Sequence, residues 1–159
     1  MATPAETLTF TPDHPDAVVA RMDRLASAHH GWINITPLVR EEDEPPPQMG
    51  LSTLFSGPAH DVPVCTWVPG KAGRKGIEPD SLGIQHNAGT KTVALLATLG
   101  VPVPPGWRRE QDHPRRGLVL RVPAGVARSE QLSWLLDAAT HLSRVPLTGR
   151  WEARVRAGR

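Results

Sequence analysis

The segment 150–156, RWEARVR, alternates apolar and charged side chains at every position. Trp151, Ala153 and Val155 occupy one set of alternate positions, and Arg or Glu residues occupy the other. Successive side chains of a β-strand point to opposite faces of a sheet, so this pattern predicts a strand with one apolar face and one strongly basic face. Such a strand fits best in a sheet that is covered on one side only.

Similar one-sided patterns recur along the chain and predict further strands at 7–10, 32–39, 51–55, 62–68, 81–86 and 118–122. Apolar stripes at helical spacing predict three helices, which follow residues 11–16, follow residues 87–90, and begin near Ser129. Together they predict an α+β fold, with a mostly antiparallel or mixed sheet of five to seven strands and about three helices packed on one face. The uncovered face should display the outward Arg residues of segment 150–156.

The length and the cysteine content limit the class of protein. A chain of 159 residues most simply forms one domain. No apolar run approaches the roughly 18 residues of a membrane span, and the N-terminus lacks the pattern of a secretory signal. Cys65 is the only cysteine and lies in an alternating apolar segment, which favours a buried, inert thiol over a nucleophile. We therefore expect a soluble, cytoplasmic protein without membrane contact; no pattern fixes its oligomeric state.

Two connections within this domain are distinctive in composition. Segment 40–49 contains four consecutive acids followed by three prolines, which predicts an extended, solvated loop. Segment 69–80 carries Lys71, Arg74 and Lys75 among glycines, which predicts a flexible basic connection. A protein-interaction adaptor that uses the acidic loop is one alternative function.

Charge is distributed unevenly along the sequence. Residues 1–60 carry three basic and eight acidic side chains, whereas residues 61–159 carry fifteen and eight. The asymmetry predicts a non-enzymatic protein whose basic C-terminal half contacts an anionic macromolecule, either a nucleic-acid backbone or an acidic protein surface. The Arg, Ala and Pro usage of a GC-rich genome would give the same asymmetry. The candidate anion-binding residues are Lys91, Arg115, Arg116, Arg121, Arg150, Arg154 and Arg156.

Segment 107–123 supports an alternative with a pocket. An imidazole near a carboxylate can act as a general base, and paired guanidinium groups can hold a phosphate. If strands 81–86 and 117–123 are neighbours, such a pocket would belong to an enzyme or a small-anion-binding protein. Its residues would be Lys91, Arg115 and Arg116 together with His86, Gly89, Thr90, Asp112 and His113. Turn formation explains residues 112–117 without any substrate and is the favoured interpretation, although the two are compatible.

Established catalytic and metal-binding motifs are missing from the sequence. The spacing of Gly83, Gly89 and Lys91 does not fit a P-loop, and Ser56 lacks the flanking glycines of a nucleophile elbow. No pair of His or Cys residues has the spacing of a zinc site. We therefore expect no metal and no cofactor.

Overall fold

The computed structural model describes residues 4–44 and 61–158. The predicted strand 51–55 and the part of the acidic Pro-rich segment at 45–49 lie outside the described residues. The strands are β1 (Glu6–Phe10), β2 (Trp32–Pro37), β3 (Val64–Val68), β4 (Ala72–Gly73), β5 (Gly76–Ile77), β6 (Asp80–Gln85), β7 (Arg108–His113), β8 (Gly117–Val122) and β9 (Trp151–Arg156). The helices are α1 (Asp16–Ala28), the short 3-10 helix η1 (Glu41–Asp43), α3 (Thr92–Thr98) and α4 (Arg128–Leu142).

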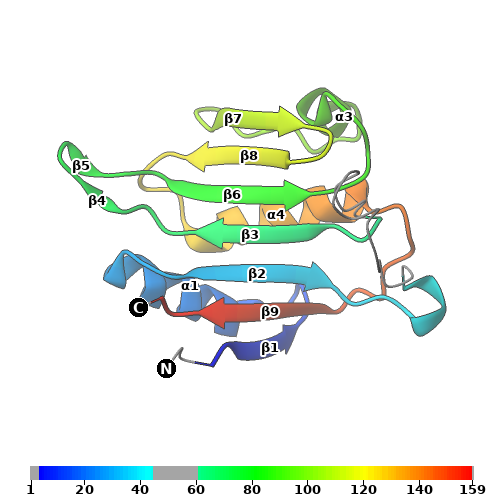
Figure 1. Ribbon diagram of the computed structural model, residues 1–159, viewed down its shortest axis with the longest axis horizontal. Helices are drawn as coiled ribbons and strands as arrows, with labels where there is room; N and C mark the ends of the chain where they lie inside the picture. The colour runs from blue at the N-terminus through cyan, green and yellow to red at the C-terminus, as the bar shows by residue number, and fades with distance from the viewer. Residues whose placement is uncertain (1–3, 45–60, 159) are drawn as a thin grey trace, which may run out of the picture.

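Seven strands form one antiparallel sheet in the order β1-β9-β2-β3-β6-β8-β7 (Figure 1). The last strand of the chain, β9, therefore lies between the first two, β1 and β2. The remaining two strands, β4 and β5, form a separate hairpin that extends from the end of the sheet between β3 and β6. This arrangement confirms the predicted α+β fold.

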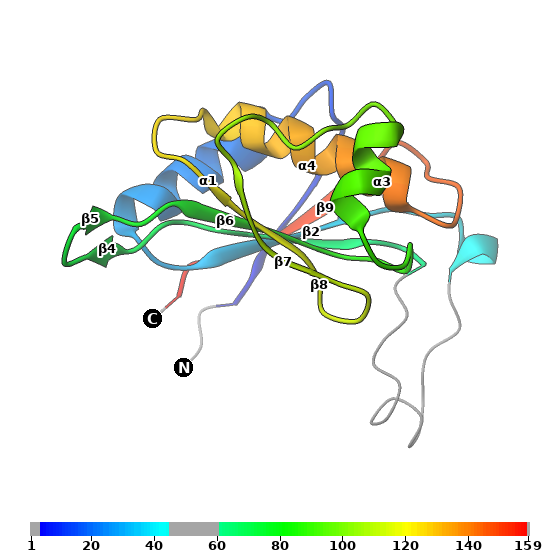
Figure 2. The ribbon, with the colours of Figure 1, turned by 90° about the horizontal axis from the view of Figure 1, so that it is seen from above.

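The three α-helices of the described chain all lie on one side of the sheet (Figure 2). Helix α4 packs over β3 and β6, α1 lies beside α4, and α3 lies near the edge formed by β7. We call the opposite side of the sheet the open face, because no α-helix of the described residues covers it.

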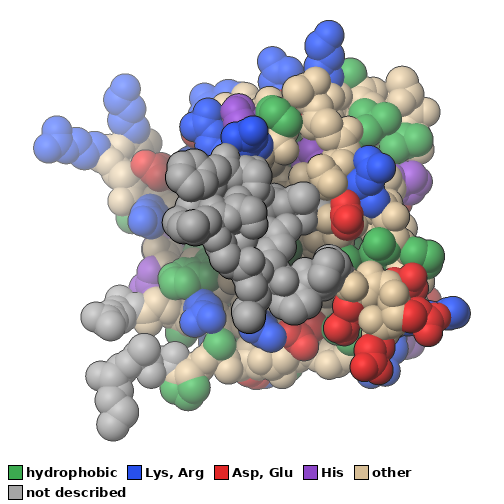
Figure 3. All heavy atoms as spheres, turned by 45° about the vertical axis from the view of Figure 1, so that its right-hand side comes forward, with side chains coloured by type: hydrophobic (Ala, Val, Ile, Leu, Met, Phe, Trp, Pro, Cys, Tyr) green, Lys and Arg blue, Asp and Glu red, His purple; other side chains and the backbone are tan. Residues whose placement is uncertain are grey.

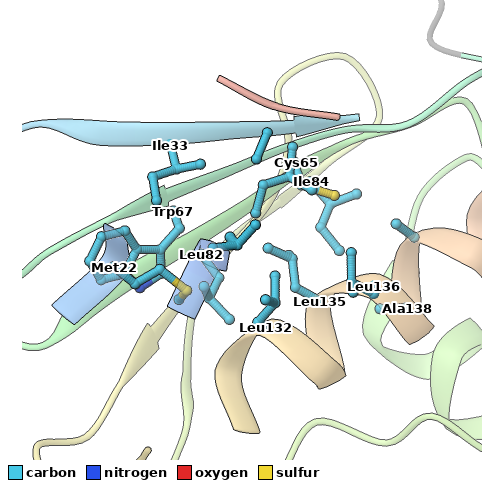
Figure 4. Packing of buried hydrophobic residues seen from close by; sticks show 14 of the residues in the cluster. Met22, Ile33, Cys65, Trp67, Leu82, Ile84, Leu132, Leu135, Leu136 and Ala138 are labelled. Carbon is cyan, nitrogen blue, oxygen red and sulfur yellow. The ribbon is translucent and has the colours of Figure 1, made fainter. Parts of the chain in front are cut away.

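The core fills the layer between the sheet and the helices (Figure 4). Ile33, Trp67 and Leu82 come from adjacent strands and are at most 1% exposed, and Leu132 and Leu135 of α4 pack against the same layer. Burial of a side chain of this size stabilises the fold by about 1.5–3 kcal/mol. The buried side chains are alternate residues of each strand, so the register that builds the core also fixes which side chains reach the open face.

Two local features differ from the sequence-based expectations. Residues 69–80, expected as a flexible connection, include the hairpin β4–β5. Helix α3 begins at Thr92, so residue 91 also lies outside the helix expected to follow residues 87–90. This N-cap residue, Lys91, has a left-handed backbone (φ 59°) and makes no capping hydrogen bond through its side chain. Asp112 of β7 supplies the missing cap, because its Oδ2 accepts a hydrogen bond from the Val93 N–H at 3.1 Å.

A buried polar network connects α4 to the sheet. Trp67 donates its Nε1–H to Gln131 Oε1 at 2.9 Å, and Gln131 Nε2 donates to Asp80 Oδ2 at 3.1 Å. The other Asp80 oxygen accepts the Gly70 N–H at 2.8 Å. Arg128 Nε lies 3.4 Å from Asp80 Oδ2, a distance typical of a loose ion pair. The network joins β3, β6 and the start of α4 at the point where the β4–β5 hairpin leaves the sheet.

We predict that Gln131→Leu lowers the free energy of unfolding by about 2–3 kcal/mol, because it leaves the Trp67 N–H buried without its partner and removes one of the hydrogen bonds to Asp80. Chemical denaturation followed by tryptophan fluorescence measures the change. The matched control is Gln85→Leu on the open face, where the side chain is exposed and the expected change is within about 0.5 kcal/mol. Equal losses in the two variants would contradict a stabilising role for the network.

An ion pair attaches the edge strand β1 to α1. Arg21 Nε donates to Glu6 Oε2 at 2.9 Å, and Arg21 Nη2 lies 2.6 Å from Glu6 Oε1. These hydrogen bonds, more than the charges of Arg21 and Arg24, hold the pKa of Glu6 below its usual value of 4.5. A depressed carboxyl pKa contributes stability above the unfolded-state pKa, and this contribution is lost as the pH falls through the folded-state pKa.

We therefore expect Glu6→Gln to be less stable than the parent protein at pH 7, by a margin that shrinks as the pH falls below 4.5 and Glu6 becomes protonated. Denaturation midpoints measured across this pH range test the expectation. Glu78→Gln removes an exposed carboxylate that makes no ion pair within the described residues, and it should follow the parent at each pH. A Glu6→Gln defect that persists undiminished at low pH would rule out the ion pair as its cause.

Candidate anion-binding surface

Strand pairing arranges the side chains of the open face in rows that run across the sheet. The central row passes through Arg154, Asn34, Thr66, Gly83 and Val119. The next rows on either side of it contain the residues two positions before and two positions after on each strand, because alternate residues share a face. The row nearest the β4–β5 hairpin contains the largest side chains of the open face.

The row nearest the hairpin combines three arginines with a tryptophan. It runs through Arg156, Trp32, Val68, Ser81, Arg121 and Arg108. The step from Trp32 to Val68 continues the register of the Ile33–Trp67 pair. With neighbouring strands about 4.8 Å apart, the row is roughly 24 Å long.

Two of these arginines are a like-charged pair. Arg108 of the edge strand β7 lies directly opposite Arg121 of β8. Glu110, at the irregularity in β7, neutralises only Arg121, with Nε to Oε2 at 2.8 Å. Like charges opposite one another destabilise a strand pair, and Glu110 offsets this repulsion at Arg121, whereas Arg108 has no ion-pair partner within the described residues.

The β4–β5 hairpin adds three more cations at the same end of the sheet. Arg74 and Lys75 form its two-residue tip, because Gly73 pairs with Gly76 on either side of them. Lys71 lies at its base, and all three cationic side chains are exposed. Figure 3 shows Lys and Arg side chains at the end of this projection.

We define the hairpin-end surface by these cations and the tryptophan between them. Its members are Lys71, Arg74, Lys75, Arg108, Arg121, Arg156 and Trp32. Within the part of the chain that the structure describes, only Arg121 among these cations takes part in an ion pair. The acids nearby are Glu110 and the exposed Glu78, so the surface has a net positive charge.

Trp32 is the one large aromatic side chain that the described open face exposes, at 39%. Its Nε1–H donates to Asn34 Oδ1 at 3.1 Å, and Asn34 Nδ2 donates to Thr66 Oγ1 at 3.0 Å. This polar chain leads from the hairpin-end surface into a shallow hollow of about 290 Å³ at the centre of the face, where Gly83 has no side chain. The hollow and the tryptophan allow a partner to approach the sheet closely.

Among residues 4–44 and 61–158, the opposite end of the sheet has no comparable excess of positive charge. Arg115 and Arg116 lie in the β7–β8 turn, and Arg150 precedes β9, with its carbonyl accepting the Leu38 N–H at 2.8 Å. Acidic side chains of η1 and the residues around it lie at this end too, and Figure 3 shows a group of acids at its lower right. The acids are Glu41, Glu42, Asp43, Glu44 and Asp61, and the cations are Arg40, Arg115, Arg116, Arg144 and Arg150.

The predicted anion-binding residues therefore do not form one cluster. Arg121 and Arg156 belong to the hairpin-end surface, whereas Arg115, Arg116 and Arg150 lie at the other end, as described above. Arg154 lies in the central row and pairs with Glu152 at 2.8 Å. Lys91 caps α3 at the outer edge of β7.

The residues of the alternative pocket are divided between the two sides of the sheet. His113 occupies the row of Gly117 on the open face, and its Nδ1 accepts hydrogen bonds from the N–H groups of Arg115 and Arg116, both at 3.1 Å. His86 lies on the helix side and is 3% exposed. Its Nδ1 accepts the Ala88 N–H at 3.1 Å, so Nε2 is the nitrogen that can donate to Thr92 Oγ1, 3.0 Å away. Each imidazole therefore stabilises a local turn by accepting backbone N–H hydrogen bonds.

Part of that alternative pocket does come together. Thr90, Lys91, Arg109 and Asp112 line a shallow hollow of about 390 Å³ between α3 and β7, and Gly89 (φ 95°) shapes the turn before it. A carboxylate already occupies the N-terminus of α3, since Asp112 caps it. A negative charge at this position disfavours a bound anion, so the geometry supports a structural role for these residues.

Sequence reasoning missed Trp32, Arg108 and the three hairpin cations. The alternation of segment 32–39 already puts Trp32 on the face opposite Ile33 and Ile35. The Arg108–Arg121 pair depends on the β7–β8 register, and Lys71, Arg74 and Lys75 matter because the hairpin projects from the same end of the sheet.

Other classes of site find no support in the described residues. They contain no group of three His, Cys, Asp or Glu side chains that could hold a metal ion. No helix among them is long and apolar enough to cross a membrane. The chain matches no protein-family model, and comparisons with curated proteins and with solved structures give no significant match. Functional inference therefore depends on the geometry.

Cys65 is completely buried on the helix side of β3, where desolvation raises its pKa to about 12. At pH 8 only about one thiol in ten thousand would be ionised, and the thiolate is the reactive form. We expect no reaction of the folded protein with a disulfide reagent such as DTNB, and one equivalent of reaction after unfolding in guanidinium chloride. Fast labelling of the folded protein would contradict this burial.

Proposed function

We propose that this protein is a non-enzymatic binding protein that contacts the phosphate backbone of a nucleic acid through the hairpin-end surface. The observation that carries the proposal is the collection of six cations from several elements at one end of the open face, only one of which is ion-paired within the described residues. Exposed cations of this kind release condensed counterions when they meet phosphates, and this release drives binding.

The dimensions of the surface favour an extended polyanion. Phosphates along one strand of a duplex repeat every 3.4 Å or so, and the row from Arg156 to Arg108 is roughly 24 Å long. The row therefore spans the axial length of about seven base pairs. An acidic protein surface presents carboxylates without such a regular repeat, so the long row supports the nucleic acid over the acidic protein.

Trp32 adds an apolar contact to this charged surface. It lies beside Arg156 in the row and is 39% exposed. An exposed tryptophan next to a cation can pack against a sugar or a base while the cation contacts the neighbouring phosphate.

A single cysteine, with no intrachain disulfide, is consistent with the reducing cytoplasm that the sequence predicts.

We expect salt-dependent binding whose slope depends on this surface. For duplex DNA, log Kobs should fall with log[salt], and Arg108→Ala combined with Arg156→Ala should reduce the slope by about 1.8, or roughly 0.9 for each lost phosphate contact. Fluorescence anisotropy with a labelled duplex at several salt concentrations measures both slopes. Arg115→Ala with Arg116→Ala removes the same charge at the opposite end and should leave the slope nearly unchanged.

Three outcomes would contradict the proposal. Failure of the protein to bind nucleic acid at low salt would exclude it. A larger effect of the Arg115 and Arg116 substitutions would move the interface to the other end of the sheet. Binding to poly-glutamate as tight as binding to DNA at equal ionic strength would favour the acidic-protein alternative.

A further inference from the structure

We infer that the β4–β5 hairpin is a groove-reading arm that enters the major groove of B-form duplex DNA. This inference rests on the proposed function, and it adds the form of nucleic acid and the element that recognises it. The major groove of B-form DNA, about 12 Å wide and about 8.5 Å deep, admits a two-stranded β-ribbon, whereas the minor groove is only about 6 Å wide.

The hairpin is long enough to reach the floor of that groove. The last sheet pair at its base is Val68 with Ser81, and Arg74 at the tip is six residues beyond Val68. At about 3.3 Å per residue, the tip extends roughly 15–20 Å beyond the sheet, which exceeds the groove depth of about 8.5 Å. Figures 1 and 2 show that the hairpin points away from both the sheet and the helices.

The hairpin is also narrow. Its strands are about 4.8 Å apart, and the pair next to the tip, Gly73 with Gly76, has no side chains. Ala72 pairs with Ile77, whose side chain is 64% exposed. An exposed isoleucine beside two cations suits a groove that presents thymine methyl groups along with guanine N7 and O6 acceptors.

The base of the hairpin is held firmly, so the arm has a defined direction. Gly70 donates its N–H to Asp80 Oδ1 at 2.8 Å, and its carbonyl oxygen lies 3.3 Å from His29 Nδ1. The Glu78 N–H donates to the Lys71 carbonyl at 2.8 Å. A Cβ at position 70 would lie 1.7 Å from the Glu78 carbonyl oxygen, so only glycine allows the two strands to cross this closely.

The cations of the sheet suit the phosphates that border the groove. Lys71 and Arg121 line a hollow at the base of the hairpin, and Arg108 lies opposite Arg121. A duplex that receives the tip in its groove would bring its backbone toward these side chains. A-form RNA has a deep, narrow major groove that side chains cannot read, so the geometry favours duplex DNA over duplex RNA.

The test combines affinity with chemical protection. Anisotropy compares duplex DNA, the corresponding duplex RNA and the single-stranded DNA for the parent protein and for Arg74→Ala with Lys75→Ala. Dimethyl sulfate, which methylates guanine N7 in the major groove, reports occupancy of the groove at saturating protein. Arg115→Ala with Arg116→Ala is the control of equal charge, and thermal denaturation confirms that both double variants fold.

We expect the parent to bind duplex DNA more tightly than the other two probes and to protect guanine N7. The tip variant should lose the protection and bind duplex DNA about tenfold more weakly, as removal of one base-contacting Arg commonly does. The control variant should keep both the guanine N7 protection and the affinity for duplex DNA. Duplex binding without protection, or protection that survives the tip substitutions, would overturn the arm while leaving the proposed function standing.

The remaining outcomes separate the two proposals further. Preference for single-stranded DNA that disappears in Trp32→Ala would overturn groove insertion and would assign recognition to stacking on the open face, still within the proposed function. Absence of binding to all three probes at low salt would remove both proposals together.

Discussion

The buried hydrogen bonds around Asp80 connect α4, the sheet and the base of the β4–β5 hairpin, the elements on which the proposed function depends. Asp80 is 8% exposed, and its two oxygens accept from the Gly70 backbone and from Gln131, which in turn accepts from Trp67. A buried carboxylate is tolerated only when it is well hydrogen-bonded, so the three donors must be in place together. The same contacts determine where α4 lies on the sheet and in which direction the hairpin leaves it.

Because the helices cover only one face of the sheet, the residues that stabilise the core differ from the residues that form the proposed binding surface. Helices on one face bury alternate residues of every strand, and the remaining residues reach solvent without affecting the core. Charges can therefore accumulate on the open face at little cost to folding. Arg108 and Arg121 show this tolerance, since a like-charged pair persists at the edge of the sheet with a single acid nearby.

Local patterns predicted most of the elements, whereas the surface depends on non-local pairing. Alternation identified the strands of the large sheet except β7, whose sequence RREQDH is polar throughout, and helical stripes identified the α-helices, because both signals come from residues close in sequence. No local pattern shows that β9 lies between β1 and β2, which brings Arg156 beside Trp32. Glycines and cations in 69–80 have the composition of a loop, although Gly70 and Gly76 are what allow the tight hairpin. Asp112 and His113 are neighbours on a strand and face opposite sides, and no local pattern indicates that Asp112 caps α3.

The strand order also changes the meaning of the charge asymmetry. In the sequence, acids predominate in residues 1–60 and cations in the rest, which suggests two halves of opposite charge. The insertion of β9 between β1 and β2 mixes the halves across the sheet, so Arg156 lies among N-terminal strands. The remaining difference in charge runs along the strands, from a basic end at the hairpin to an end near η1 where acids and cations balance. A polyanion in such a field is drawn toward one end of the open face, the end from which the hairpin projects.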